Sequence, residues 1–249
     1  MKKLLFIAAI ALLSSCKKEK TEGPSEQTPL FTKNLISVTA PGMSEWAMFY
    51  SNDRKLMSFT NTDMKVSYKP GIPFSAKKAA SGFLHEYQNA VQDAQGRVTK
   101  LDRYNSGGLT ATQEFKYSAE GYLVEQTIKA NSSNSFAKYV YEYQAGNLTT
   151  MSAYEGGMKT AMFVFEYYTN QYNPIQIDLF DFKGVQFVTD AQFGKQSKNL
   201  LKNAKMLAPD GQVFFSIDLS YTTDADGYIK TISRSSGGQS STVYTCTFQ

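Results

Sequence analysis

The stretch "FKYSAEGYLVEQ", residues 115–126, reads as the end of one β-strand, a tight turn and the start of a second strand. Large apolar side chains flank a short polar run that ends in Gly121. A hairpin loop built on a type I turn needs a residue with positive φ at its end, and glycine adopts that conformation without a Cβ clash. The stretch therefore predicts a β-hairpin closed by Gly121.

The same unit recurs along the chain, which indicates a series of hairpins. Regular copies are "VQDAQGRVTKL" (91–101) and "YEYQAGNLTTM" (141–151), and less regular copies occupy 49–59, 165–177 and 219–232. The glycines Gly96, Gly121 and Gly146 are spaced by 25 residues, and Gly227 lies in the turn of the last copy. We predict that all four are turn glycines with a structural role.

The strands between the turns show the period-two alternation of half-buried strands. In one example, Val213, Phe215, Ile217, Leu219 and Tyr221 share a face, opposite Ser216, Asp218 and Ser220. The stretch "AMFVFEYY" (161–168) is apolar on both faces. It predicts a central strand covered on two sides, with a second face that lines a pocket as the alternative.

Sequential hairpins pair with their neighbours, and a large twisted sheet tends to curl. The predicted fold is all-β: an antiparallel up-and-down meander of about a dozen strands in a single domain, residues 34–249, curled into a barrel or a partly open barrel. One short helix is expected in "SKNLLKNAKML" (197–207), where Leu200, Leu201, Ala204 and Leu207 have helical spacing. We expect that helix to cap a sheet edge.

The N-terminus predicts secretion. Residues 1–15 have two lysines, an apolar run and small residues, the pattern of a signal peptide. The residues Leu13, Ser14, Ser15 and Cys16 resemble the lipobox of bacterial lipoproteins, which implies a diacylglyceryl group on the Cys16 thiol and cleavage before it. An ordinary secretory signal with an incidental cysteine is the alternative.

Residues 16–33 are rich in Lys, Glu, Pro, Ser and Thr, so we expect a flexible tether. Two or more acyl chains anchor a protein stably. The expected location is therefore the cell envelope, lipid-anchored and at the outer membrane, with the membrane as a partner.

Charge and residue types exclude several function classes. The chain has 26 Lys and Arg against 22 Asp and Glu, and removal of Lys2 and Lys3 leaves 24 − 22 = +2, which predicts no nucleic-acid partner. Once Cys16 is lipidated, Cys246 has no disulfide partner, and we expect it to pack as a small hydrophobic residue. His85 is the sole histidine, so no metal site, catalytic residue or cofactor is predicted.

Acidic pairs leave one enzymatic alternative, a carboxylate-based hydrolase. The pairs that could serve are Asp178 with Asp181 and Glu155 with Glu166. Asp224 and Asp226 beside Gly227 fit a turn better than a calcium loop, because the remaining ligand positions are missing.

The turn residues Tyr117, Gly121 and Leu123, together with the lipobox, resemble those of a family of uncharacterised bacterial envelope lipoproteins with a porin-like fold. The resemblance implies a porin-like meander in the envelope. A weaker likeness is to the tyrosine/aspartate hairpin repeats of bacterial toxin shells, although the aspartate is missing at Ser118 and Gln144.

The ending "STVYTCTFQ" is similar to the ends of outer-membrane barrels, which makes a membrane-spanning barrel an alternative. A lipid anchor would be redundant on such a barrel, and charged residues interrupt the strands.

The surplus of aromatic residues, 16 Tyr, 17 Phe and one Trp, suits core packing and also a ligand pocket. The leading hypothesis is a non-catalytic envelope protein that binds an apolar or carbohydrate ligand, or a partner protein of the envelope, through its curved sheet; the ligand-binding residues are not identified. The alternatives are the hydrolase and a passive scaffold subunit of a surface assembly.

Overall fold

The structure of the chain is a computed structural model that describes residues 30–52, 54–61, 64–68, 76–80, 83–133, 135–175, 190–237 and 242–249. Side chains are described for these residues except 64–68, 76–80, 83–85 and 190–191. The described part contains sixteen strands and one helix of four residues. The predicted signal peptide and nearly all of the predicted tether lie outside the described residues.

The elements follow one another along the chain, and their bounds are β1 Leu35–Thr39, β2 Trp46–Tyr50, β3 Leu56–Thr60, β4 Met64–Tyr68, β5 Ala76–Ala80, β6 Phe83–Gln92, β7 Val98–Asn105, β8 Gly108–Tyr117, β9 Leu123–Ala130, β10 Phe136–Gln144, β11 Asn147–Glu155, β12 Met158–Tyr172, α1 Asp190–Phe193, β13 Asn199–Leu207, β14 Val213–Thr223, β15 Ile229–Ser236 and β16 Thr242–Phe248.

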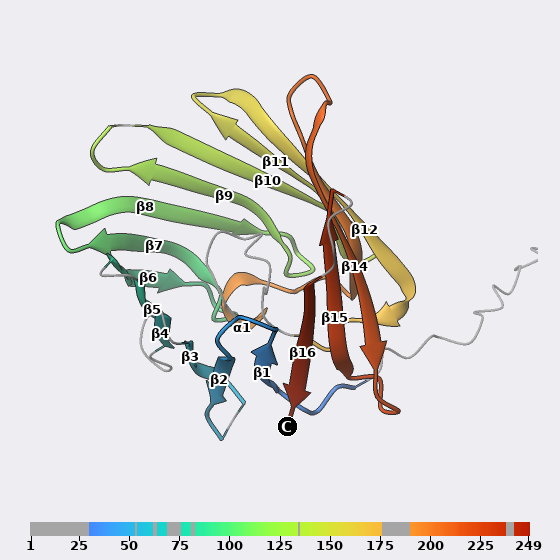
Figure 1. The fold of residues 1–249 in the computed structure, drawn as a ribbon. Helices are drawn as coiled ribbons and strands as arrows, with labels where there is room; N and C mark the ends of the chain where they lie inside the picture. The colour runs from blue at the N-terminus through green and yellow to red at the C-terminus, as the bar shows by residue number, and fades with distance from the viewer. Residues whose placement is uncertain are drawn as a thin grey trace, which may run out of the picture.

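Every strand pairs antiparallel with the next, and β1 also pairs with β16, so the sheet curls into a barrel with a continuous ring of pairings (Figure 1). This confirms the predicted all-β up-and-down meander. The described strands outnumber the expected dozen, and β1 to β5 have only five residues each. The repeat copy at 49–59 covers β2 and β3, whereas no copy was found over β1, β4 or β5, since five residues leave little room for alternation.

The pairing is uneven around the ring. The β10–β11 pair registers eight residue pairs, whereas β1 and β2 register only two, Ser37 with Ala47 and Val38 with Trp46. The chain ends reinforce this region, because the backbone amides of Asn34 and Gln249 each donate to the carbonyl of the other, at 2.6 and 2.9 Å. We call the junction of β16, β1 and β2 the seam.

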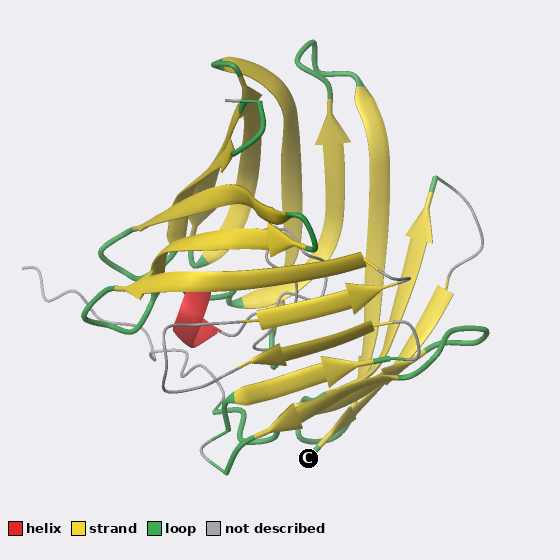
Figure 2. Ribbon diagram, turned by 90° about the vertical axis from the view of Figure 1, so that its left-hand side faces the viewer, coloured by secondary structure: helices red, strands yellow, loops and turns green. Residues whose placement is uncertain are grey.

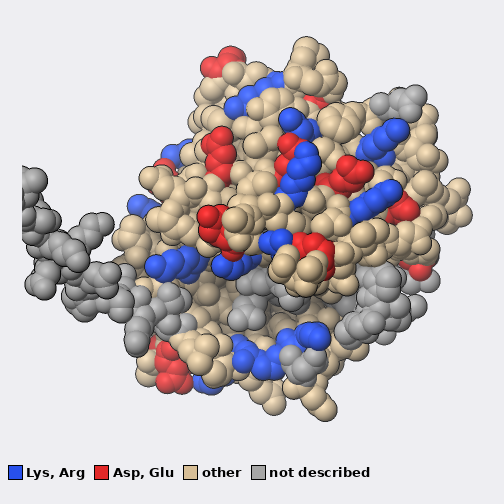
Figure 3. Space-filling model, turned by 180° about the vertical axis from the view of Figure 1, so that it is seen from behind, with Lys and Arg blue, Asp and Glu red and all other residues tan. Residues whose placement is uncertain are grey.

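The inner face of the barrel carries one continuous apolar core. Phe59, Leu101 and Leu123 are fully buried within it. The outer face is polar, with cations and anions interspersed (Figure 3). Neighbouring strands exchange ion pairs there, such as Lys116 with Glu125 at 2.7 Å and Lys205 with Glu166 at 3.4 Å. The alternation in the sequence therefore corresponds to strands with an apolar inner face and a polar face toward solvent.

The predicted helix over 197–207 is wrong. Residues Asn199–Leu207 form strand β13, which pairs with β12 on one side and β14 on the other. Leu200, Leu201 and Ala204 are all buried. Apolar residues on both faces of a strand imitate the spacing of an amphipathic helix, and only the two partner strands, distant in sequence, decide between them.

The described helix is α1, which lies within the curve of the sheet (Figures 1 and 2). Its last residue, Phe193, is 0% exposed and packs edge-on against Phe115 of β8, with ring centroids 5.1 Å apart. The Tyr117 hydroxyl donates to the Val98 carbonyl at 2.6 Å and lies 3.4 Å from the Gln192 carbonyl. These contacts fasten α1 to the inner wall.

Residues 194–198, which we call the strap, run from α1 to β13 across two hairpin turns. The Lys195 amide donates to the Gly121 carbonyl at 3.0 Å, and the Lys198 amide donates to the Gly146 carbonyl at 2.9 Å. The Ser197 hydroxyl accepts from the Leu148 amide at 3.1 Å. Two turns of the sequence repeat are thus joined to one segment from a distant part of the chain.

Two strands are less buried than their patterns predict. In β12, Phe165 is buried, but Met162 and Val164 on the other face are only half-buried, so this stretch is not covered on two sides. In β14, Ile217 and Leu219 are buried, whereas Val213 and Phe215 on the same face are 51% and 41% exposed. The N-terminal end of β14, which contains Val213 and Phe215, therefore extends beyond the core.

Candidate functional site

The predicted turn glycines all occupy turns between strands. Gly96, Gly121, Gly146 and Gly227 have φ angles of 78°, 93°, 81° and 84°. Each of Gly96, Gly121 and Gly227 donates its amide to the carbonyl three residues earlier, as a closed turn requires. These glycines therefore have a structural role.

Cys16, the predicted lipidation residue, lies outside the described part of the chain.

The groups considered for nucleophilic chemistry do not come together. Cys246 is buried on β16, and burial raises the pKa of its thiol to about 12, so the thiol stays protonated and unreactive. It is a free cysteine, as expected. His85 lies on β6 opposite Lys78 in register, but its side chain is outside the description.

The acidic pairs are separated or bound in turns. Glu155 pairs with Met158, and Glu166 lies eight residues further along β12, about 26 Å away at 3.3 Å per residue. Asp224 accepts from the amides of Asp226 and Tyr228, both at 2.9 Å, which is turn chemistry. Asp178 and Asp181 lie outside the described residues. Among the described residues, no group of three His, Cys, Asp or Glu could hold a metal ion.

The described structure does contain a pocket at the seam, with a volume of about 220 Å³. It lies between the inner faces of β15, β16, β1 and the start of β2, beneath the loop that joins β1 to β2. We call it the seam pocket. Its lining residues are mainly apolar or aromatic, with one cation: Val38, Thr39, Ala40, Met43, Ser44, Trp46, Ile232, Arg234 and Tyr244.

Strand pairing places these side chains on one face. Residues directly opposite each other in an antiparallel pair project to the same side of the sheet. Trp46 pairs with Val38, and Tyr244 pairs with Ile232. Arg234 pairs with Leu219, which is 2% exposed and belongs to the core. The seam pocket therefore belongs to the interior of the barrel.

The aromatic wall of the pocket packs against the core of the barrel. Trp46 rests on Phe59, with ring centroids 4.6 Å apart, and Phe59 is completely buried. The neighbouring loop turns at Gly42, which has a φ of 75°, and the amide of the exposed Met43 donates to the Ala40 carbonyl at 3.1 Å. The Ser37 hydroxyl donates to the Glu45 carboxylate at 2.5 Å and ties the loop to β1. The pocket is largely preformed.

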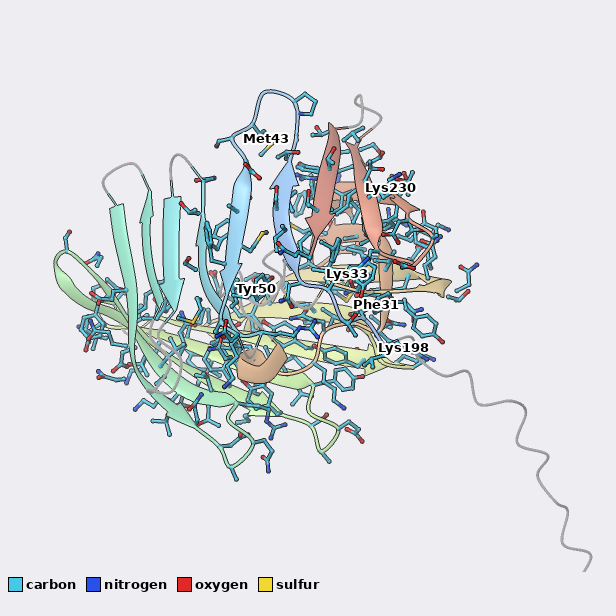
Figure 4. All side chains as sticks on the ribbon, turned by 90° about the horizontal axis from the view of Figure 1, so that it is seen from below. Phe31, Lys33, Met43, Tyr50, Lys198 and Lys230 are labelled. Atoms are coloured by element: carbon cyan, nitrogen blue, oxygen red, sulfur yellow. The ribbon has the colours of Figure 1, made fainter. Side chains whose placement is uncertain are left out.

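The chain enters the barrel at the other end of β1. The Tyr228 hydroxyl accepts from the amides of Thr32 and Lys33, at 2.7 and 2.9 Å, and Lys33 forms an ion pair with Asp226 at 3.1 Å. Figure 4 shows Lys33 and Met43 at opposite ends of β1. The five residue steps from Asn34 to Thr39 span about 17 Å. The pocket thus lies away from the point where the predicted tether leaves.

Sequence reasoning missed this pocket. It noted the aromatic surplus and the ending "STVYTCTFQ", which contains Tyr244, but it named neither Trp46 nor Arg234 as a site residue. The available signals were the sole tryptophan and an arginine two residues after the buried Ile232, on the same face of its strand. They become a site only when β15, β16, β1 and β2 are brought together by closure of the ring.

Comparison with known proteins defines a structural class. The chain has the fold of two porin-like proteins, one from Bacteroides uniformis and one from Bacteroides vulgatus. The TM-scores are 0.62 and 0.60, with 13% and 14% sequence identity. The alignments cover 87% and 88% of this chain, and 95% and 99% of the neighbours. The TM-scores show a shared fold, which agrees with the porin-like meander implied by the sequence resemblance.

No family model matches the sequence, and no curated protein matches it. Among the described residues, no helix is long and apolar enough to cross a membrane.

Proposed function

We propose that this chain is a lipid-anchored protein of the cell envelope, at the outer membrane, that binds a small apolar or carbohydrate ligand in the seam pocket and catalyses no reaction. The observation that carries the proposal is a preformed pocket on the inner face, lined by Trp46, Tyr244 and Ile232. Ligand pockets are typically apolar and aromatic with a few polar groups that set orientation. The volume of about 220 Å³ is small for such a pocket and suits one ring-sized group.

The anchor part of the proposal rests on Cys16 and the composition of residues 16–33. The contacts of Thr32 and Lys33 with Tyr228 fix where the tether leaves the barrel. Because the seam pocket lies at the far end of β1, the anchored protein would present it away from that exit. A ligand could then be bound without competition from the lipid surface.

The polar outer wall favours this arrangement over a membrane-spanning barrel. Lys116, exposed over 71% of its side chain, pairs with Glu125 on the outside of the sheet. A lipid-facing lysine or arginine near the bilayer midplane costs about 2–4 kcal/mol. Several such residues along the same wall oppose insertion.

Of the two acidic pairs considered, the one with described positions does not support hydrolysis. A glycosidase needs two carboxyl groups within about 5 to 10 Å. The pair with described positions, Glu155 and Glu166, is too far apart, and Glu166 is engaged by Lys205.

Lipidation is tested by growing cells that express the full chain with an alkyne-labelled fatty acid. We expect label in the protein and none in the Cys16→Ser variant, which should leave the membrane fraction. A labelled Cys16→Ser variant, or an unlabelled wild-type chain, would overturn the anchor.

Ligand binding is tested by thermal shift of the detergent-solubilised full chain against a panel of monosaccharides, oligosaccharides and fatty acids. We expect a ligand whose stabilising effect is lost in Trp46→Ala. The matched control is Phe49→Ala, because Phe49 lies on the same strand but is 54% exposed. An equal effect of both substitutions, or no hit in the panel, contradicts ligand binding and favours the scaffold alternative.

A further inference from the structure

We propose that the seam pocket binds a sugar ring that bears a carboxylate, with the Arg234 guanidinium holding the carboxylate and Trp46 and Tyr244 contacting the ring. The inference rests on the proposed ligand-binding function and goes further, because it identifies the ligand class and the residue that selects it. Three features of the pocket lead to it: its charge, its aromatic wall and its size.

Among the described residues that line the seam pocket, Arg234 is the one charged side chain. Arg234 is half-buried on the core-facing side of β15. It has no hydrogen bond or ion pair in the described structure, and none of the residues that line the seam pocket is acidic. The nearby Glu45 is engaged with Ser37 instead. A cation partly removed from water without a counter-charge is unfavourable, so a bound anion would lower the free energy of this site.

A guanidinium favours a carboxylate in particular. It presents N–H donors in a flat fork that matches the two oxygens of a carboxylate. No lysine and no second arginine line the pocket. One positive charge balances the single charge of a carboxylate, whereas a phosphate monoester carries close to two. A neutral acyl chain would leave Arg234 unpaired.

The aromatic wall favours a ring with an apolar face. A pyranose has C–H groups on its faces and hydroxyls around its edge, so one face can pack on an aromatic side chain while the edge stays hydrated. Phe59 packs against the Trp46 ring on the core side, with ring centroids 4.6 Å apart, and holds it in position. Ser44, from the loop that joins β1 to β2, lines the pocket and offers a hydroxyl to the edge of the ring. This combination of groups fits a uronic acid.

The test uses the full chain, purified from membranes in detergent, with oligosaccharides of galacturonic acid and of glucuronic acid. Their methyl esters are matched probes in which only the charge is removed, and sulfated neutral oligosaccharides test the other common acidic group. We expect the acids to bind at least tenfold more tightly than the esters. Equal binding of acid and ester, tighter binding of the sulfated sugars, or no sugar binding overturns the inference.

The variants assign the effect to one side chain. Arg234→Gln should weaken binding of the acids about 10- to 100-fold, the range for a lost charge-assisted hydrogen bond, and leave binding of the esters within twofold. Arg234→Lys keeps the charge but loses the fork and should be intermediate. Lys230→Gln is the control, because Lys230 is an exposed cation on the same strand (Figure 4). If Lys230→Gln weakened binding of the acids as much as Arg234→Gln, the effect would come from surface charge in general, and the role of Arg234 would be overturned.

Failure of the inference is distinguishable from failure of the proposed function. If neutral sugars or fatty acids bind and Trp46→Ala abolishes that binding while Arg234→Gln does not, ligand binding stands and the carboxylate class is overturned. If no probe binds, both are overturned. Thermal unfolding of each variant shows whether it is folded, and Arg234→Lys keeps the test valid should Arg234→Gln unfold.

Discussion

The strap and the seam are two ways in which this chain closes its barrel, and they differ in packing. At the strap, a Cβ atom on Gly194 would lie 2.7 Å from the Gly121 carbonyl oxygen, and the amides of Lys195 and Lys198 donate to the carbonyls of the Gly121 and Gly146 turns. At the seam, β1 and β2 register only two residue pairs, and a pocket of about 220 Å³ lies beside them. The regular repeats therefore build a tightly filled wall, while the irregular N-terminal strands leave the space that a ligand could use.

This contrast predicts that substitutions under the strap cost stability, whereas the seam can be altered with less loss of stability.

The largest effect is expected for Phe193→Ala. Phe193 is 0% exposed and packs against Phe115, and deletion of a buried phenylalanine ring costs about 3–5 kcal/mol. The measurement is the free energy of unfolding in urea. Phe214→Ala is the control, because Phe214 is 64% exposed, and we expect it to change stability little. A loss as small for Phe193→Ala as for Phe214→Ala would show that α1 does not support the barrel.

Gly194→Ala comes next, with an expected loss of about 2–4 kcal/mol from overpacking and backbone strain together. Gly194 has a φ of 77°, and a Cβ atom there would lie 2.7 Å from the Gly121 carbonyl oxygen, which is backbone and cannot turn aside. Gly211→Ala is the matched control: its φ is 89°, and its Cβ would meet nothing within 4 Å. Equal losses in the two variants would show that the strap can move away from the turn.

Gly121→Val should cost about 1–3 kcal/mol through backbone strain at a φ of 93°. Gly96→Val has the same kind of strain at a φ of 78°, but no atom lies within 4 Å of its Cβ, whereas Gly121 faces Arg97 and Lys195 at 3.6 Å. We expect the larger fall in melting temperature for Gly121→Val. An unchanged melting temperature would mean that the turn does not need glycine.

The smallest effect concerns the seam and depends on pH. Burial raises the pKa of Cys246 to about 12, while a thiol in the unfolded chain ionises near about 8.5. Above that pH the unfolded chain releases the proton and the folded chain keeps it. Stability should therefore fall as pH rises from about 9 towards 12, by at most about 1.4 kcal/mol per pH unit.

The measurement compares urea unfolding of the wild type and Cys246→Ala between pH 8 and 10. Burial also raises the pKa values of Tyr50, Tyr117 and Tyr221, so their contribution begins higher and is common to both proteins. We expect a shallower pH slope for Cys246→Ala. The same slope in both proteins would show that the thiol is accessible at the seam.

Much of the fold was predictable because the turns are local. Each turn has a glycine after a polar corner, and the strands on either side alternate between apolar and polar residues. Both features can be recognised from a few consecutive residues, and they identified the hairpins around Gly96, Gly121 and Gly146. The segment 197–207 failed for the opposite reason. Leu200, Leu201 and Ala204 suit a helix or a doubly covered strand equally well, and β12 and β14 decide the matter.

The hairpin repeat, the all-β class and the expectation of an anchored chain could be read from the sequence, because each depends on residues close together along the polypeptide. The crossing of residues 194–198 over the turns of Gly121 and Gly146 became evident from the folded chain, as did the pocket that Arg234, Tyr244 and Trp46 share. Trp46 and Arg234 are separated by most of the chain, and no local pattern brings them together. Their proximity follows from closure of the ring between the first strands and the last, where β1 pairs with β16.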